Sequence, residues 1–279
     1  MNHEVNAPDE LVQPGGKELR AGALSALVVS DPEEKCAAVY ALREIENVDT
    51  VSAMVAPEGL PGRPAKPELI PPSQVPRRAM STQEGRASLL HALAHIEFNA
   101  INLALDIIWR FPDMPENFYL DWRKVAVEEA EHFTMLARRL EELGCSYGDM
   151  PAHNGLWEMA EKTQGDILAR IALVPRTLEA RGLDVSPAIR QRLMQAGDSE
   201  SAGLLDIILR DEVGHVAIGN DWYRWLCERE ELDLVETYAQ LAQRYHAPRL
   251  RGPFNLEARR QAGFNDEELV ALQRMAAQT

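Results

Sequence analysis

The sequence predicts an all-α protein in which a four-helix bundle carries extra helices at both ends of the chain. Two observations lead to this fold class. Long stretches place apolar residues three and four positions apart, as a helix with one buried face requires. No segment shows the sustained apolar–polar alternation with β-branched residues that is typical of a strand. The chain has 279 residues, which allows one elaborated domain or two small ones.

Residues 1–80 are expected to form an N-terminal region of tail, short helices and extended chain. Residues 1–16 are polar and contain two prolines and two glycines, which is typical of a loose tail. Residues 17–48 fit one or two short helices. Seven prolines from position 57 to position 76 then exclude a helix or a strand. We therefore expect an extended segment there, the proline-rich strap.

Residues 81–230 contain the four long helices of the predicted bundle. The run STQE at 81–84 is a capping-box pattern, and the helix that it opens can continue to Phe111 before Pro112 stops it. A second helix fits 116–143 and ends at Gly144.

The second half of the predicted bundle is less regular. A third helix lies within 155–181 and ends at Gly182, and Ser186-Pro187 opens a short helix that ends near Gly197. The fourth long helix runs from about 200 to 229.

Residues 231–279 are expected to form C-terminal helices packed on the bundle. Helices fit 233–245 and 266–277, and an Arg-rich loop from His246 to Arg260 joins them. Its four arginines either bind an anionic substrate group, which Arg can contact with two parallel hydrogen bonds, or pair with acidic residues and helix ends. In a chain of net charge −15 we favour the structural role. The four are Arg249, Arg251, Arg259 and Arg260.

Acidic and histidine residues interrupt the apolar faces of the long helices. Glu97 lies among the apolar positions of the first helix. Glu129 and His132 fill two gaps in the apolar face of the second helix, which makes an E-x-x-H motif, and Glu212 and His215 repeat this motif on the fourth. Glu179 is the only acidic residue between Ile167 and Leu183.

These six residues point to a metal centre. Four carboxylates converging in a helical core cannot all stay ionised without cations, because each buried charge costs several kcal/mol. Residues at i and i+3 share one helix face, so a Glu can contact two metals while the His binds one of them. One Glu from each of two helices plus E-x-x-H from the other two is the di-iron or di-manganese pattern of ferritin-like bundles.

The motif spacing adds weight to the ferritin-like prediction. Glu97 and Glu129 are 32 residues apart, and Glu179 and Glu212 are 33 apart, as two similar helical hairpins require. We therefore predict two divalent metal ions, iron first and manganese as the alternative. The predicted ligands are Glu97, Glu129, His132, Glu179, Glu212 and His215.

Three stretches carry a resemblance to a known family. LLHALAHIE at 89–97, VPRTLEARGLD at 174–184 and RGPFNLEARR at 251–260 resemble the DUF455 family of bacterial ferritin-like proteins. The resemblance extends from about Leu19 to Leu272 and implies a ferritin-like fold, but no reaction. In the ligand pattern alone, the chain is similar to a non-haem di-iron tRNA hydroxylase.

Several polar residues near the predicted ligands have open roles. Glu128 and Glu131 flank the first E-x-x-H motif, and we expect a solvated helix flank rather than a replacement for Glu129. Asp211 precedes Glu212 and could support a metal-bound His. A polar stripe on the first helix is expected to contact solvent or another helix, with support of a metal-bound His as the alternative. The stripe consists of His91, His95, Asn99, Asn102 and Asp106.

The leading functional hypothesis is an oxidoreductase, a non-haem di-iron oxidase or oxygenase that activates dioxygen or peroxide on a small-molecule substrate. The alternatives are an iron-binding or storage protein without an organic substrate, and a structural or interaction protein that keeps the metal site for stability. A homodimer is left open.

Composition excludes other classes. Lys and Arg number 29 against 44 Asp and Glu, a balance that repels nucleic acid and anionic membrane surfaces. The apolar runs fall short of the ~20 residues that span a membrane. The N-terminus lacks a signal pattern, and Cys36, Cys145 and Cys227 form no CxxC motif. We therefore expect a reducing cytoplasm.

Overall fold

The computed structural model describes residues 18–76 and 79–277. The predicted loose tail at 1–16 lies outside the described residues. Within them the regular elements are helices, and pairing of extended chain is limited to an isolated bridge between Leu69 and Ala152. The all-α prediction is therefore confirmed. None of the helices in this part of the chain is long and apolar enough to cross a membrane.

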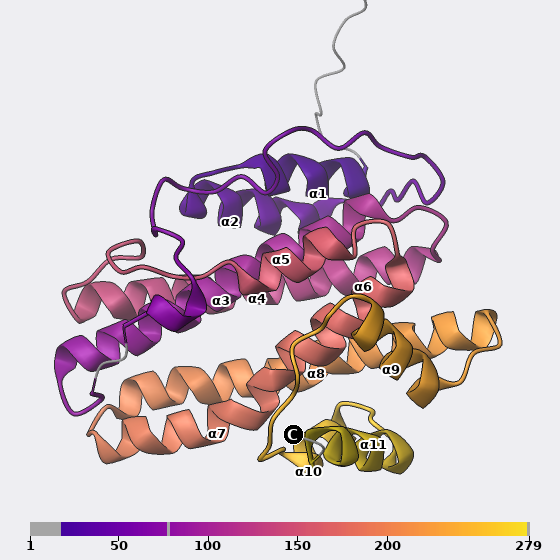
Figure 1. Cartoon of the computed structure of the whole chain (residues 1–279). Coiled ribbons are helices and arrows are strands. Elements are labelled where there is room, and N and C mark those ends of the chain that lie inside the picture. The colour runs from indigo at the N-terminus through magenta and orange to yellow at the C-terminus, as the bar shows by residue number, and fades with distance from the viewer. Residues whose placement is uncertain (1–17, 77–78, 278–279) are drawn as a thin grey trace, which may run out of the picture.

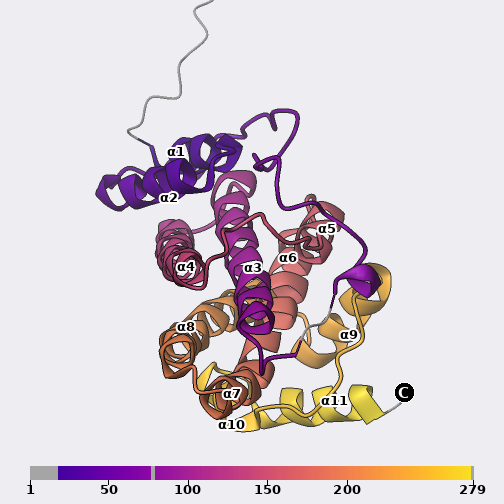
Figure 2. The same cartoon turned by 90° about the vertical axis from the view of Figure 1, so that its left-hand side faces the viewer.

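The bundle is built on two long antiparallel helix pairs. α3 (Gln83–Arg110) packs extensively on α4 (Glu116–Glu142), and α7 (Ala180–Gln195) packs on α8 (Ser199–Arg229). The views of Figures 1 and 2 agree that α4 and α8 lie next to each other, and they contact each other directly. α6 (Ile167–Leu173) continues the line of α7 and also packs on α8.

Side chains close to the predicted boundaries fix the starts of two long helices. The Thr82 hydroxyl accepts a hydrogen bond from the Gly85 amide at 3.0 Å, so Thr82 is the N-cap of α3, one residue after the position that the capping-box pattern gives. The Asp198 carboxylate caps α8 through the Ser201 amide at 3.0 Å. α3 ends at Arg110, before Pro112, as predicted.

The predicted helix boundaries within residues 155–197 were wrong. The chain forms α5 (Gly155–Lys162), then α6, then a π-helical turn at Val174–Glu179, which we call the π segment, and then α7. α7 passes through Gly182 and Pro187 without ending. A glycine in a helix costs only about 1 kcal/mol and a proline about 3, and the packing of α7 along α8 offsets both.

Two short helices cover one side of the bundle. α1 (Leu19–Val28) packs on α3, and α2 (Pro32–Ala41) packs on α4 (Figure 1). Over the described residues 57–76, the proline-rich strap contains no helix longer than one turn, and it turns at 58–59 and at Pro72–Gln74. Gly62 fits where the strap crosses α1, because a Cβ there would lie 2.2 Å from the carbonyl oxygen of Val28.

The C-terminal part forms α9 (Leu234–Arg244), α10 (Leu256–Gln261) and α11 (Asp266–Ala277). α10 occupies the end of the predicted Arg-rich loop, so that loop is shorter than predicted. The buried Arg259 guanidinium makes two hydrogen bonds to the Asp184 carboxylate, at 3.0 and 2.8 Å. Arg260 pairs with Asp266 at 3.2 Å. These two arginines therefore have the structural role.

Candidate metal centre

Three helices bring four of the predicted ligands into one buried group. Glu97 comes from α3, Glu129 and His132 from α4, and Glu212 from α8. Each offers one ligand atom, and these atoms all lie within 4.8 Å of one another. All four residues are buried, with exposed fractions between 0% and 8%.

His215 joins this group from α8, one turn after Glu212. Its Nδ1 lies 3.0 Å from Oε1 of Glu129 and 3.8 Å from Oε1 of Glu212. Its ring centroid is 5.7 Å from that of His132. The two E-x-x-H motifs therefore face each other across the contact between α4 and α8.

Glu179, the last residue of the π segment, supplies the remaining carboxylate. Its Oε2 is buried without a hydrogen-bond partner. The charges that act on it are those of Glu129, Glu212 and His215. Four of the six residues selected from the sequence thus form the buried group, His215 contacts that group, and Glu179 interacts electrostatically with it. We call these six residues the candidate metal centre, or the metal centre for short.

Unpaired ligand atoms distinguish this centre from an ordinary buried polar cluster. Buried polar atoms normally have hydrogen-bond partners, because an unpaired one costs about 1–3 kcal/mol. In the metal centre five such atoms lack one: the Oε2 atoms of Glu97, Glu129, Glu179 and Glu212, and Nδ1 of His132. Bound cations would give such atoms partners, and carboxylate oxygens with imidazole nitrogens suit first-row divalent metals. The group can hold a metal ion.

The pKa shifts in the centre follow from burial and from the closeness of the charged groups. Burial raises the pKa of Glu97 well above its usual range, and the charge of Glu129 adds to this. Burial and the charge of Glu129 also raise the pKa of Glu212. Burial alone would lower the pKa of His132, but close contacts with Glu129 and Glu97 raise it to about 11. Negative charge in this group is therefore unfavourable without a nearby positive charge, which a metal cation would supply.

The Nε2 atom of each histidine in the centre contacts a carboxylate from the opposite helix. Nε2 of His132 (α4) lies 3.2 Å from the Asp211 carboxylate (α8), and Nε2 of His215 (α8) lies 2.9 Å from the Glu128 carboxylate (α4). Such partners fix the orientation of an imidazole and leave its Nδ1 facing the centre.

This arrangement bears on one role that the sequence left open and corrects one expectation. Asp211 has the supporting contact considered for it. Glu128 is not a solvated flank, since it contacts His215 and its side chain is only 25% exposed. Glu131 is the solvated residue, in an exposed ion pair with Arg43. The signal that was missed is an acid immediately before the Glu of both E-x-x-H motifs.

The polar stripe of α3 does not face solvent, so that part of the expectation was wrong. All five of its residues are buried, because the N-terminal region and the 145–153 loop cover this face. Nε2 of His91 accepts a hydrogen bond from the Gly148 amide at 2.9 Å, and Nδ1 of His95 lies 3.0 Å from the Tyr147 hydroxyl. Asp106 forms an ion pair with the buried Arg170. The stripe holds neighbouring segments together.

Comparison with known proteins identifies a family whose description assigns no activity. A family model described as "Protein of unknown function (DUF455)" matches residues 28–270. An uncharacterized protein of Haemophilus influenzae is 44% identical over 259 residues, which covers 88% of this chain and 90% of the relative. No solved structure matches the chain.

Proposed function

The chain belongs to the DUF455 family, and the description of that family assigns no function. We therefore propose a function from the chemistry of the metal centre. The proposal is a ferritin-like carboxylate protein that holds two divalent metal ions, iron first and manganese as the alternative. The observation that carries it is the group of five buried, unpaired ligand atoms on four carboxylates and a histidine. Two dications match the four carboxylates in charge.

The contacts support a division of the ligands between two metal positions. Nδ1 of His132 lies within 3.6 Å of both Glu97 and Glu129, which suggests one position. His215 contacts Glu129 and Glu212, and Glu179 interacts with these same three residues, which suggests the other. Glu129 approaches both histidines. Glu212 also has a ligand atom within 4.8 Å of those of Glu97 and His132, so Glu129 and Glu212 would both be available to either metal ion.

The proposed activity is that of an oxidoreductase acting on a small-molecule substrate. Iron bound at such a centre supplies redox chemistry towards dioxygen or peroxide. The chain's own residues supply the conditions. The carboxylates balance the cation charge, Asp211 and Glu128 orient the two histidines, and the apolar helix faces limit access of water.

Metal analysis tests this proposal. Wild-type protein loaded anaerobically with Fe(II) and then desalted should retain two irons per chain, measured by inductively coupled plasma mass spectrometry. Glu129→Gln should lose most of this iron, whereas Glu131→Gln, which changes an exposed residue two positions away, should match the wild type. One iron or none in the wild type would contradict the proposal.

Oxygen uptake separates the proposed oxidoreductase from iron storage. Exposing the Fe(II)-loaded protein to air should consume dioxygen in proportion to the two bound irons. If the protein instead oxidises and retains many irons per chain when excess Fe(II) is supplied, storage is the better description of its function.

A further inference from the structure

The π segment connects two helices of the bundle and carries one of the proposed metal ligands. It is a single widened turn between α6 and α7, and it ends at Glu179. A π turn is rare within α-helical structure, and such turns are frequently found at functional sites. Since Glu179 is the carboxylate that this segment brings to the metal centre, contacts that hold the segment also determine where that carboxylate lies.

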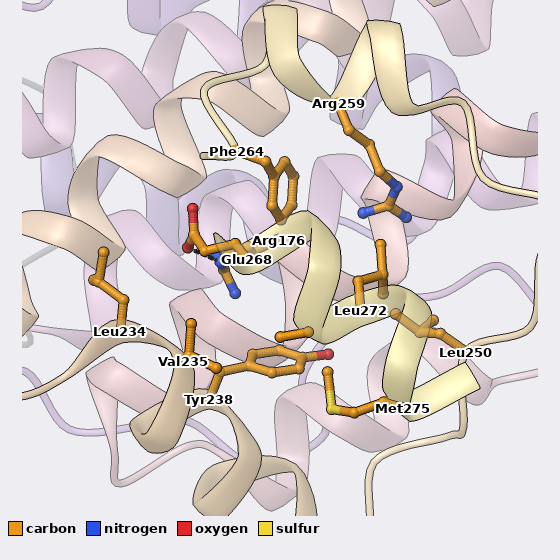
Figure 3. Close-up of a pocket in the computed structure, with 11 residues that line it drawn as sticks. Arg176, Leu234, Val235, Tyr238, Leu250, Arg259, Phe264, Glu268, Leu272 and Met275 are labelled. Atoms are coloured by element: carbon orange, nitrogen blue, oxygen red, sulfur yellow. Dashed lines mark hydrogen bonds and ion pairs between the residues drawn. The ribbon is translucent and has the colours of Figure 1, made fainter. Parts of the chain in front are cut away.

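Arg176, three residues before Glu179, anchors the segment to the C-terminal helices. It is 5% exposed and forms an ion pair with Glu268 of α11. Its Nε donates a hydrogen bond to Oδ1 of Asn220 on α8 at 2.8 Å. Figure 3 shows Arg176 and Glu268 next to each other, with Phe264 and Tyr238 on either side.

Aromatic rings surround the Arg176 guanidinium. Its carbon lies 4.5 Å from the ring centroid of Tyr223, 4.8 Å from that of Phe264 and 5.1 Å from that of Tyr238. A cation over aromatic faces gains electrostatic attraction, more so when it is desolvated. Two of these rings, like Glu268, belong to the chain after α8, so residues beyond the bundle supply most of this environment.

Two further contacts fix the residues on either side of Arg176. The Thr177 hydroxyl lies 3.0 Å from the hydroxyl of Tyr238 on α9. Pro175 packs on α8 at Gly219, where a Cβ would come within 3.1 Å of the proline ring. Three consecutive residues of the π segment are therefore held from outside the segment. Glu268 is itself held at the start of α11, where its carboxylate accepts a hydrogen bond from the Asn265 amide at 2.9 Å.

We infer that the C-terminal helices α9 and α11 position Glu179 for metal binding, with the Arg176–Glu268 ion pair as the connection. Arg176 and Glu268 are positioning residues, because they act through the π segment and not on the metal. The inference rests on the proposed two-metal function. It assigns the C-terminal helices a role in completing the metal position that Glu179 and His215 share, while the position of Glu97 and His132 is independent of them.

Titration calorimetry with Mn(II), which needs no redox partner, tests this inference on the full chain. Glu268→Gln keeps the size of the side chain but removes its charge. We expect one Mn(II) to bind as in the wild type and the other to bind at least ten times more weakly. Glu179→Gln should reproduce this pattern. Glu267→Gln changes the exposed neighbour on α11 and should bind both ions as the wild type does.

Hydrogen exchange at the π segment distinguishes a loss of Glu179 positioning from a general loss of structure. Hydrogen exchange of the metal-free protein should become faster in Glu268→Gln at 174–180 and stay unchanged in α3 and α4. If Glu268→Gln does not fold, the double variant Arg176→Met/Glu268→Met, which leaves no unpaired buried charge, is measured by the same criteria.

The outcomes are distinct. Two Mn(II) ions bound by Glu268→Gln with wild-type affinities, while Glu179→Gln binds one of them weakly, would overturn the inference and leave the two-metal function standing. Equal weakening of both ions would also overturn it, since that is what a purely structural role predicts. A wild-type chain that binds fewer than two Mn(II) ions would overturn the proposed function together with the inference.

Discussion

At the scale of single residues, the acids behind the two histidines offer the most specific test of the metal centre. Asp211 holds His132 and Glu128 holds His215, each from the opposite helix. Removing either charge should let one imidazole rotate and should lower its basicity. We expect Asp211→Asn and Glu128→Gln each to lower metal affinity roughly 10–100-fold, the usual range for such partners, as measured by competition with a chelator.

Glu131→Gln is the matched control for this prediction, because Glu131 is an exposed acid on the same helix as Glu128. Its metal affinity should equal that of the wild type. A similar loss in all three variants would mean that general negative charge, and not imidazole orientation, governs metal affinity.

Lys35 is a second residue whose environment makes a measurable prediction. It is fully buried, and its Nζ donates hydrogen bonds to the carbonyl oxygens of Leu27 and Gly62 and to the Asn102 side chain. None of these acceptors carries a charge. Burial, and secondarily the charge of Arg63, lowers the pKa of Lys35 to about 7.

The low pKa of Lys35 makes stability depend on pH. Between pH 7 and about 10.4, the unfolded chain keeps this proton and the folded chain releases it, so the unfolded state binds more protons and stability rises with pH. From pH 7 to 8.5 we expect a gain of about 1.5 kcal/mol from this group, measured by urea unfolding. Lys35→Met should lack this gain, and an equal pH dependence in the two proteins would contradict the assignment.

At the scale of secondary-structure elements, the close approach of α8 to the π segment depends on a glycine. A Cβ at Gly219 would meet the Pro175 ring at 3.1 Å, whereas a Cβ at Gly203, on the same helix, would meet nothing within 4 Å. Overpacking typically costs 1–3 kcal/mol, and Ala gains up to about 1 kcal/mol over Gly in a helix.

Two alanine variants of α8 should therefore have opposite effects. Gly203→Ala should raise the free energy of unfolding by about 0.5–1 kcal/mol, and Gly219→Ala should lower it by about 1–2 kcal/mol, both measured by chemical denaturation with chelator present. If Gly219→Ala is as stable as Gly203→Ala, the π segment adjusts to α8 more easily than its contacts suggest.

In the same region, the helix boundaries could not be predicted from local sequence signals. Gly182 and Pro187 are normally breakers, yet α7 includes both. The π segment has no sequence pattern that distinguishes it from an α-helix. Its geometry follows from contacts with distant chain, such as the ion pair of Arg176 with Glu268, 92 residues later. Helix propensities in a window of neighbouring residues contain no information about such contacts.

At the scale of the whole molecule, metal binding and folding should be coupled. The folded state brings the four carboxyl groups together, which is unfavourable for their ionised forms, whereas the unfolded chain separates them. A metal that binds only the folded state adds RT ln(1 + [L]/Kd), about 2.7 kcal/mol for each site at a free concentration of 100 times Kd. We expect the melting temperature to rise with Mn(II) concentration and to fall on addition of EDTA, measured by calorimetry.

A chain without the centre provides the control for this coupling. The double variant Glu129→Ala/Glu212→Ala removes two of the four carboxylates, so its melting temperature should not respond to Mn(II). A response of the same size in the variant and the wild type would show that Mn(II) stabilises the protein from elsewhere, for example at its acidic surface.

The sequence by itself determined the all-α class and selected the side chains that form the buried Glu/His group, Glu97, Glu129, His132 and Glu212, together with His215, which contacts it. Both are expressed in local spacing, since apolar positions three and four apart define a buried helix face, and a charged residue at such a position is directed inward. The tertiary structure alone decided which acid holds which histidine, how the chain passes from α6 to α7, and that Arg259 pairs with Asp184. These depend on contacts such as Arg259–Asp184, 75 positions apart, and Arg176–Glu268, 92 positions apart, which only the packing of the helices brings together.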